Sequence, residues 1–371
     1  MIEQPIIPDR VEGNSQVVDL LSKWLDFANK GDMRFVGLVA CRTSEDVVTD
    51  CAGAQGTEFA AYFGLDELKR NLAEHLKNRS MAIKQGAEVD QSCWIYSIAQ
   101  WTVGYDFFQW LVNVEIIRRR EGTPGPLKVH FYPGKDGSLE TSLNNPLREQ
   151  MFYKVCRPMV PLLGGVESDK PDGRYLDHVN AFSYLPVIKA YRDGIELPKF
   201  HAPESAKQFI REKFQDRRPV IITLRETELH SYRNSRLLEW LRFAAYLKDL
   251  GEDVVFVRDT RLADEPLDGW ETVPEASKEL EIRMALYEIS RHCFFGSNGP
   301  FGLVTISDIP WTVIYPLDNK KSYKYNNPDV WERTMGIKAG EQYPWCRPDQ
   351  RFILKEDTFE NLVQAWEDLG K

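Results

Sequence analysis

Residues 219–260 read PVIITLRETELHSYRNSRLLEWLRFAAYLKDLGEDVVFVRDT, and this stretch is the clearest evidence for the fold class. Two short apolar runs, 220–224 and 253–257, have the length and the β-branched content of buried strands. Between them, residues 235–250 carry apolar side chains at helical spacing. Strands that alternate with helices of this length predict parallel pairing in βαβ units.

The same alternation continues toward the C-terminus. Two further strands are predicted at 293–297 (CFFGS) and 311–316 (WTVIYP), with helices over 277–291 and 300–307. Residues 216–371 are therefore predicted to form a Rossmann-like α/β lobe with a C-terminal wrap.

An earlier series has the same pattern. Strands are predicted at 93–99 and 127–133, with helices over 105–120 and 148–165. A looser connector follows and carries the helical segment PESAKQFIREKF. Residues 92–215 are predicted to form a first Rossmann-like lobe, which makes the protein an α/β chain with two such lobes.

The N-terminal residues 1–83 are predicted to form a small separate α/β module. Helices are expected at 17–31 and 59–78, around two strand-like segments, and the polar stretch 84–91 reads as a linker. These residues resemble a small module of unknown role encoded in phage and proteobacterial genomes, in which a helix and a GxVAxV-type strand precede LxxLERLKxRL.

Composition and charge narrow the functional classes. A net charge of -9 over 371 residues argues against a broad surface for a nucleic-acid backbone. The N-terminus lacks the pattern of a secretory signal, and no apolar run approaches the roughly 20 residues of a membrane span. Six scattered cysteines without a CxxC pair predict reduced thiols, a cytoplasmic location and no structural zinc.

Polar side chains follow each strand predicted in the second lobe. Because ligands of open parallel sheets bind beyond the carboxyl ends of the strands, these residues are the candidates for a binding site. The candidates are Arg225, Glu226, Thr227, Arg233, Asn234, Ser235, Arg258, Asp259, Thr260, Ser297, Asn298, Gly299, Asp318, Asn319 and Lys320.

The segment GSNGP (296–300) is the most specific of these. Ser297 or Asn298 is expected to cap the helix that follows, and Gly299 allows close approach to the backbone. A helix N-terminus with free amide donors attracts phosphate groups. The alternative is an ordinary strand-to-helix turn without a ligand.

Three arginines at the strand ends could neutralise a diphosphate, since guanidinium groups match phosphate geometry. These are Arg225, Arg233 and Arg258, and the alternative is local pairing of Arg225 with Glu226 and of Arg258 with Asp259. On the helix predicted after 277, three charged residues could reach a ribose or ring, although a solvated helix face explains them better. They are Glu281, Arg283 and Glu288.

Other candidates lie outside this set. Asp106, at the start of the helix after 93–99, could act as a general base, or it could only complement the helix dipole. Glu115 and Arg118 are spaced to form an ion pair. In the tail, a polar and aromatic stretch could line a cleft between the lobes or form a packed wrap, and its candidates are Glu341, Gln342 and Trp345.

Several linked motifs resemble one set of uncharacterised bacterial proteins over about 92–355. The segments YDFFQWLVNVEIIRRREG, TLRETELHSYRNSRLLEWLRFA, LEIRMALYEI, SNGP and GEQYPW match FDFxxFLxxAExxRR, TLRExxxxxxRNSxxxxWxxFA, LRMALYELA, NNGP and GEQFPF. Ser297 departs from the pattern, which has Asn there. The matching positions are Asp106, Glu115, Arg118, Arg225, Glu226, Arg233, Asn234, Ser235, Arg283, Glu288, Asn298, Gly299, Pro300, Glu341 and Gln342.

Those proteins are usually described as glycosyltransferase-like, of the two-lobed GT-B type, and are linked to surface polysaccharide. The resemblance implies a metal-independent glycosyltransferase without a cofactor, with a nucleotide sugar as co-substrate and a hydroxyl group of a glycan, protein or DNA base as acceptor. Asp106 and Arg233 are then the expected catalytic residues. The nucleotide sugar is expected to contact Arg225, Glu226, Asn234, Ser235, Arg258, Ser297, Asn298 and Gly299.

Two alternatives stay open at this point. The phage-like N-terminal module suggests a transferase that acts on a hydroxymethylated DNA base, although the acidic charge weighs against it. The other alternative is a non-catalytic binding or assembly protein, because a fold by itself does not secure activity.

Overall fold

In the computed structural model of the protein, the described residues are 90–98, 101–133, 138–143, 145–170, 172–176, 182–228, 231–316, 331–332 and 335–370. All of them belong to one compact unit. The module predicted over residues 1–83 lies outside the described residues, as do Asp318, Asn319 and Lys320.

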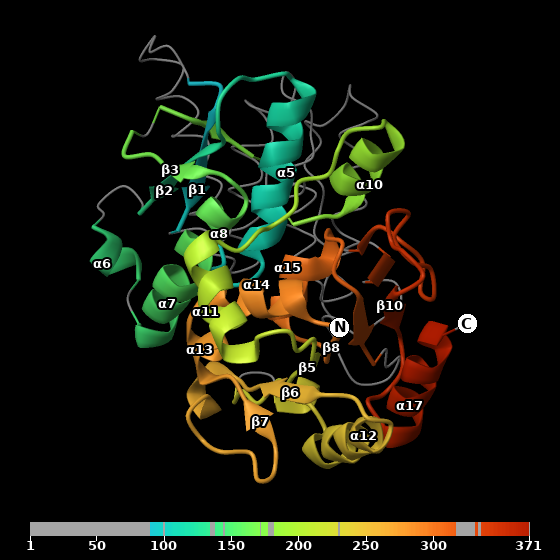
Figure 1. The fold of residues 1–371 in the computed structure, drawn as a ribbon. Coiled ribbons are helices and arrows are strands. Elements are labelled where there is room, and N and C mark those ends of the chain that lie inside the picture. The colour runs from blue at the N-terminus through green and yellow to red at the C-terminus, as the bar shows by residue number, and fades with distance from the viewer. Residues whose placement is uncertain are drawn as a thin grey trace, which may run out of the picture. The chain divides into compact units, whose positions relative to one another are not determined.

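The first sheet has four parallel strands in the order β3-β2-β1-β4. Its centre is formed by β1 (Cys93–Ser97) and β2 (Lys128–Tyr132), with the two-residue strands β3 (Val166–Glu167) and β4 (Arg174–Tyr175) at the edges. After β1 the chain forms α5 (Phe107–Arg120), which packs against the sheet (Figure 1). Its strongly apolar face is buried, which explains why the helix forms against this sheet.

The helical segments that follow β2 are α6 (Leu139–Ser142), α7 (Pro146–Met151), η2 (Phe152–Cys156) and α8 (Arg157–Leu162). The last three form one continuous helical run, in which η2 is π-helical. Asn145 begins this run, because its side chain accepts a hydrogen bond from the backbone N–H of Arg148. The connector then forms α10 (Leu185–Arg192) and α11 (Glu204–Phe214).

The second sheet has six parallel strands in the order β10-β9-β8-β5-β6-β7. The bounds of its strands are β5 Val220–Thr223, β6 Val254–Val257, β7 Glu271–Thr272, β8 His292–Phe295, β9 Trp311–Ile314 and β10 Gln350–Ile353. The chain builds outward from β5 to β7 on one side and from β8 to β10 on the other. The topological switch point therefore lies between β5 and β8, whose carboxyl ends are adjacent.

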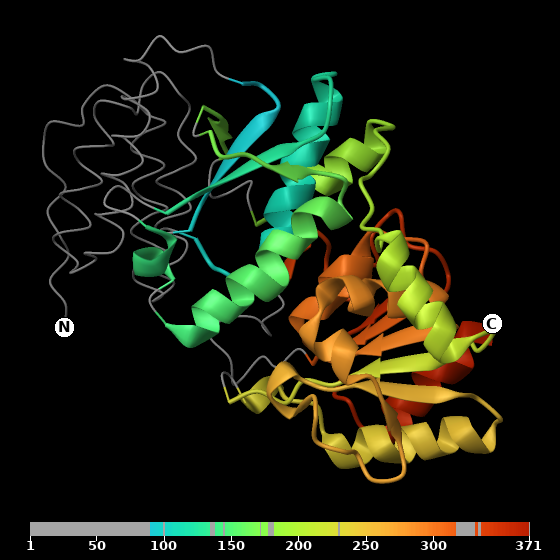
Figure 2. The same cartoon turned by 60° about the vertical axis from the view of Figure 1, so that its left-hand side comes forward.

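Helices cover both faces of the second sheet (Figures 1 and 2). On one face, α12 (Leu237–Asp249) and α17 (Phe359–Glu367) pack over Val220, Ile222 and Phe294. On the other face, α13 (Pro274–Lys278) and α14 (Leu280–Ile289) pack over Ile221 and Val255, and α11 packs against α14. Because alternate residues of a strand point to opposite faces, a strand covered on both faces reads as one continuous apolar run.

The core on the α14 face continues into the first sheet without interruption. One cluster of buried residues includes Trp94 of β1 and Trp110 of α5 together with Leu286 and Tyr287 of α14. Around Tyr96, the rings of Trp101, Phe107 and Trp110 lie 4.6 to 5.0 Å away in edge-on contacts. Much of the high aromatic content of the chain therefore serves this core.

The predicted α/β class with two Rossmann-like parallel sheets is confirmed, and all the strands and long helices predicted in the described part are present. Four strands were not predicted, because β3, β4 and β7 have only two residues each and β10 lies in the polar tail. The helix predicted over 300–307 is shorter than expected. It consists of the 3-10 turn η5 (Gly299–Phe301) and the four-residue helix α15 (Gly302–Thr305).

The C-terminal tail packs against the second sheet as a wrap. The side-chain amide of Gln342 takes the place of a strand residue beside β10. Its Nε2 donates to the carbonyl of Phe352, and its Oε1 accepts from the N–H of Phe352. The indole of Trp345 donates to the carbonyl of Thr305 at 2.9 Å. Of the two expectations for this tail, the structure therefore supports the packed wrap for Gln342 and Trp345.

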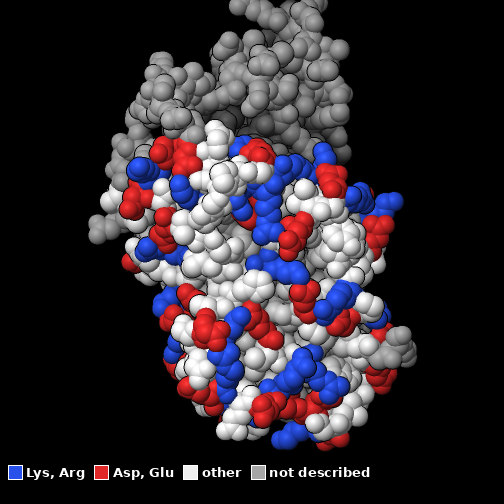
Figure 3. Space-filling view, turned by 45° about the horizontal axis from the view of Figure 1, so that its top comes forward, with Lys and Arg blue, Asp and Glu red and all other residues white. Residues whose placement is uncertain are grey.

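The surface of the described part carries both signs of charge. On the face shown in Figure 3, basic and acidic side chains are interspersed, and the basic ones form no broad continuous field among the described residues. No helix in this part of the chain has the length and apolar character needed to cross a membrane. The four cysteines in it are free, three of them buried: Cys93, Cys156, Cys293 and Cys346.

Candidate functional site

The loops that follow β5 and β8 meet at the switch point of the second sheet. Arg233, in the short 3-10 turn η3 (Ser231–Arg233), donates from Nε and Nη2 to the hydroxyl of Ser297, at 3.1 and 2.9 Å. Its Nη2 also donates to the Ser297 carbonyl at 3.0 Å. Ser297 is buried. The structure thus brings together two residues that the sequence placed at the ends of different strands.

Below this contact, a chain of hydrogen bonds runs along the carboxyl edge of the sheet. The buried side chain of Asn298 donates from Nδ2 to the carbonyl of Thr223 at 3.0 Å. The hydroxyl of Thr223 shares a hydrogen bond of 2.9 Å with the phenol of Tyr287 on α14. Because these groups are buried, their mutual bonding holds the ends of β5 and β8 in one arrangement.

Two of the predicted site residues, Asn234 and Ser235, form hydrogen bonds within the loop that follows β5. Ser235 accepts from the N–H of Arg225 with its hydroxyl and donates its own N–H to the Arg225 carbonyl, both at 2.9 Å. Asn234 bonds both backbone groups of Thr227 through its amide. These contacts give Asn234 and Ser235 a positioning role, since they shape the loop that carries Arg225 and Arg233.

Arg258 forms a two-pronged ion pair with Glu226. The distances are 3.0 Å from Nε to Oε2 and 2.6 Å from Nη2 to Oε1, and both side chains are about nine-tenths buried. Hydrogen bonding to the Glu226 carboxylate raises the pKa of the Arg258 guanidinium. Pairing of Arg258 with its neighbour Asp259 was the alternative suggested by the sequence, and the structure pairs it with Glu226 instead.

The GSNGP turn differs from its predicted form. Neither Ser297 nor Asn298 caps the helix that follows, because the Ser297 hydroxyl bonds Arg233 and the Asn298 amide bonds Thr223. The helix itself has only four residues. The capping expected for Ser297 or Asn298 is therefore wrong, and the short helix has a smaller dipole than the helix predicted over 300–307 would have.

Glycine at position 299 has a steric reason. A Cβ atom at Gly299 would lie 2.5 Å from the Cβ of Tyr105, which follows β1 in the first sheet. A Cβ at Gly302 would likewise meet the ring of Phe108 at 2.5 Å. These contacts require glycine, and they place the loop after β1 directly against the loop after β8. The carboxyl ends of the two sheets therefore face each other.

Asp106 lies next to this contact. It occupies the residue before α5, with an exposed side chain that makes no capping hydrogen bond. Its position at the helix N-terminus matches the dipole-complementing alternative. Its exposure beside Tyr105 also leaves its carboxylate accessible at the edge where the two sheets meet.

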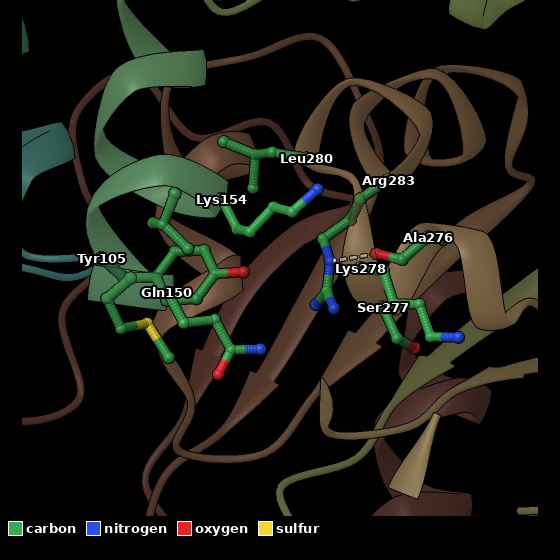
Figure 4. Close-up of a pocket in the computed structure, with 10 residues that line it drawn as sticks. Tyr105, Gln150, Lys154, Ala276, Ser277, Lys278, Leu280 and Arg283 are labelled. Atoms are coloured by element: carbon green, nitrogen blue, oxygen red, sulfur yellow. Dashed lines mark hydrogen bonds between the residues drawn. The ribbon is translucent and has the colours of Figure 1, made fainter. Parts of the chain in front are cut away.

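Arg283 is the residue for which sequence reasoning was most in error. It was expected on a solvated face of α14, and only 3% of it is exposed. Its Nε donates to the carbonyl of Ala276 at 2.7 Å, and its guanidinium lines a cavity together with Tyr105 and Lys154 (Figure 4). Helical periodicity could have predicted this burial, because Arg283 lies four residues before Tyr287 and therefore on the same, buried face of α14.

Two other expectations concern ion pairs and metals. Glu115 forms the predicted pair with Arg118, with two bonds of 2.7 and 2.9 Å, and Arg119 adds a third at 2.7 Å. Glu288 does not lie on a solvated helix face, since it accepts from the N–H of Ala202 and pairs with Lys207. No group of three or more His, Cys, Asp or Glu side chains in the described ranges is arranged to hold a metal ion.

Comparison with known proteins gives similarities of structure only. No protein-family model matches the chain, and a comparison with curated proteins gives no match. Among solved structures, one similar chain is the ADP-heptose lipopolysaccharide heptosyltransferase II of Escherichia coli, at 13% identity and a TM-score of 0.38. That similarity covers 75% of this chain and 97% of the other.

Two more solved structures are similar over the same share of the chain. The glycosyl transferase family 9 protein of Veillonella parvula has 11% identity and a TM-score of 0.44, covering 76% of this chain and 98% of its own. E. coli heptosyltransferase WaaC with ADP has 11% identity and a TM-score of 0.39, covering 75% and 99%.

Proposed function

We propose that the protein is a glycosyltransferase that moves a sugar from a nucleotide-sugar donor to a hydroxyl group of an acceptor. The observation that carries the proposal is the contact between Tyr105 and Gly299. It sets the carboxyl edges of two parallel sheets against each other, so that one sheet can hold a donor and the other an acceptor. The linked sequence motifs that resemble glycosyltransferase-like proteins support the same assignment.

The donor's diphosphate is assigned to the switch point of the second sheet. As the bond between the sugar and the diphosphate breaks, negative charge develops on the leaving diphosphate. Arg225 and Arg233 both belong to the loop that lies there, and Ser297 fixes the orientation of the Arg233 guanidinium. Fixed cations of this kind stabilise developing charge, which allows transfer without a metal ion.

The other residues predicted to contact the nucleotide sugar hold the loops of the site in place. Asn298 anchors the loop after β8 to β5, and Asn234 and Ser235 shape the loop after β5. Glu226 and Arg258 are occupied by each other, so their pair supports the same loop from the β6 side.

Asp106 is assigned as the general base. In the reaction, the acceptor oxygen forms a bond with the anomeric carbon while the bond from that carbon to the diphosphate breaks. The hydroxyl proton must leave, and an accessible carboxylate next to the sheet-to-sheet contact can accept it.

The test is the release of nucleoside phosphate from UDP-, GDP-, dTDP-, CMP- and ADP-sugars in the presence of a mixture of hydroxyl acceptors. The wild type should consume one donor class, and Asp106→Asn should lower kcat at least 100-fold with little change in donor affinity. Asp249→Asn is the matched control, because Asp249 ends α12 at the opposite edge of the sheet. Equal turnover by Asp106→Asn and the wild type contradicts the assignment of the base.

A further inference from the structure

Arg283 is a buried cation that forms no ion pair with any of the described residues. Among the described residues, no carboxylate oxygen lies within ion-pairing distance of its guanidinium, although Asp259 is near enough to interact with it electrostatically. Its hydrogen-bond partners are two neutral groups, the carbonyl of Ala276 and the side chain of Tyr287. Burying a charge is costly unless an opposite charge compensates it, so this arrangement calls for an explanation.

The guanidinium faces a cavity that both halves of the described unit build. Figure 4 shows it directed into the space between Gln150 on one side and Ser277 on the other. Tyr105, Gln150 and Lys154 line the cavity from the first half of the chain, and Ser277, Lys278 and Arg283 line it from the second. The cavity measures about 20 Å³, which is room for about one or two water molecules.

Two further cations stand at the cavity, and their own pairings are weak. Lys154 reaches Glu279 at 2.8 Å and Lys278 reaches Asp264 at 2.5 Å, but all four side chains are at least two-fifths exposed. Exposed pairs of this kind are worth little, so both lysines can turn toward a ligand. Three cations around one small opening create a positive potential that favours an anion.

The local backbone on the Lys154 side is also unusual. Lys154 belongs to the π-helical turn η2, which interrupts an otherwise α-helical run from Pro146 to Leu162. Such a turn adds one residue to the helix and is frequent at functional sites. Here it lies at the part of the helix that supplies Lys154 and Val155 to the cavity.

We propose that this cavity is a binding subsite for a phosphate group, which Arg283 contacts from within and Lys154 contacts from the rim. The cavity admits one or two oxygens of a phosphate group whose remaining atoms lie at the rim, and it excludes a nucleobase or sugar ring. The phosphate belongs either to the donor's diphosphate or to an acceptor that carries a phosphate ester. Its part in catalysis rests on the proposed transferase function, whereas phosphate binding itself does not.

The test is a titration with inorganic phosphate, at constant ionic strength balanced with sodium chloride, that follows the melting temperature of the full chain. The wild type should show a saturable rise in melting temperature beyond that in chloride. Arg283→Met should weaken phosphate binding at least tenfold, and Lys154→Met several-fold. Lys189→Met, on the exposed side of α10, is the matched control and should bind phosphate like the wild type.

Lys154→Met keeps the test valid if Arg283→Met does not fold, because Lys154 is exposed and its replacement leaves the core intact. Unchanged phosphate affinity in Lys154→Met would overturn the proposal, and so would a folded Arg283→Met variant that binds phosphate like the wild type. A wild type that responds to phosphate no more than to chloride would overturn it as well.

Competition identifies the source of the phosphate. Displacement of phosphate by ADP or UDP, with weaker nucleotide binding in Arg283→Met, assigns the subsite to the donor. Simultaneous binding of phosphate and a nucleoside diphosphate assigns it to the acceptor. Phosphate binding at Arg283 in a protein that binds no sugar nucleotide would refute the proposed transferase function and leave the subsite standing.

Discussion

Arg233 and Ser297 join the loop after β5 to the loop after β8 through three hydrogen bonds of 2.9 to 3.1 Å. Two of these bonds end on one hydroxyl oxygen, so the serine side chain fixes the direction of the guanidinium. The two strands are neighbours at the switch point of the sheet. The orientation of a cation at the proposed diphosphate site therefore depends on a residue 64 positions away in the chain.

Replacing Ser297 by alanine is expected to weaken sugar-nucleotide binding about tenfold. The substitution removes the hydroxyl that two guanidinium nitrogens contact and leaves the carbonyl contact in place, and a hydrogen bond to a charged group is worth about 1.5–3 kcal/mol. Calorimetric titration of the wild type and Ser297→Ala measures the change. Ser205→Ala, on the exposed surface of α11, is the control, and an affinity in Ser297→Ala equal to that of the control contradicts the positioning role.

The Glu226–Arg258 pair is expected to matter for stability more than for donor affinity. Glu226→Gln leaves the buried Arg258 charge without its partner, which should lower the free energy of unfolding by about 3 kcal/mol. Replacing both residues, as in Glu226→Leu with Arg258→Met, should restore most of the loss, because no buried charge then remains. Urea denaturation of the three variants measures this. A double variant as unstable as Glu226→Gln argues against the interpretation.

Gly299→Ala is expected to disturb the contact between the two sheets. The new Cβ would lie 2.5 Å from the Cβ of Tyr105, so the loops after β1 and β8 must move apart, at a cost of about 1–3 kcal/mol. Adding Tyr105→Gly to this variant removes the Cβ and ring atoms that the new methyl group would meet and should recover part of the stability. Gly104→Ala is the matched control, since a Cβ there meets no atom within 4 Å. Equal melting temperatures for Gly299→Ala and Gly104→Ala would count against the close approach.

His292 is expected to make the protein less stable as the pH falls. Burial in β8 lowers the pKa of its imidazole from 6.5 to about 3. Below pH 6.5 the unfolded chain therefore binds a proton that the folded chain does not, and the free energy of unfolding should drop by about 1 kcal/mol per pH unit down to about pH 3. Above pH 6.5 the imidazole is neutral in both the folded and the unfolded chain, so no stability is lost there.

The measurement is urea denaturation between pH 7.5 and 4.5. His292→Gln keeps a polar group near the Thr312 hydroxyl, which His292 contacts at 2.9 Å, but it cannot take up a proton. This variant should show a shallower loss of stability over the same range. Parallel pH profiles for the two proteins would exclude His292 as the cause.

The sequence was sufficient for the architecture because buried parallel strands have a distinct pattern. Segments such as 220–224 and 253–257 are apolar on both faces and are followed by long amphipathic helices, which few other folds allow. The edge strand β10 escaped prediction because its residues alternate between buried and half-buried in a polar tail. The backbone of Phe352 in β10 is bonded by the side chain of Gln342, which lies outside any strand, so no local sequence pattern predicts this contact.

The sequence predicted which strand ends meet, but not most of the contacts there. The rule that ligands lie at the carboxyl ends of parallel strands grouped Arg233 with Ser297, and the structure joins these two residues. Pairing of Arg258 with Glu226 and burial of Arg283 depend on which elements pack together, and nearest neighbours in the sequence gave the wrong partner for Arg258. The steric role of Gly299 likewise depends on Tyr105, nearly 200 positions earlier in the chain.

Binding of a sugar nucleotide tests the central claim most directly. The measurement is the melting temperature of the wild type and of Arg233→Ala with UDP-, GDP-, dTDP-, CMP- and ADP-sugars, each with magnesium and with EDTA. At about 100 times the dissociation constant, a bound donor stabilises the fold by about 2.7 kcal/mol. The proposed function predicts a saturable rise with one donor class in the wild type, the same in EDTA, and its loss in Arg233→Ala. No rise with any donor, or an equal rise in both proteins, would contradict it.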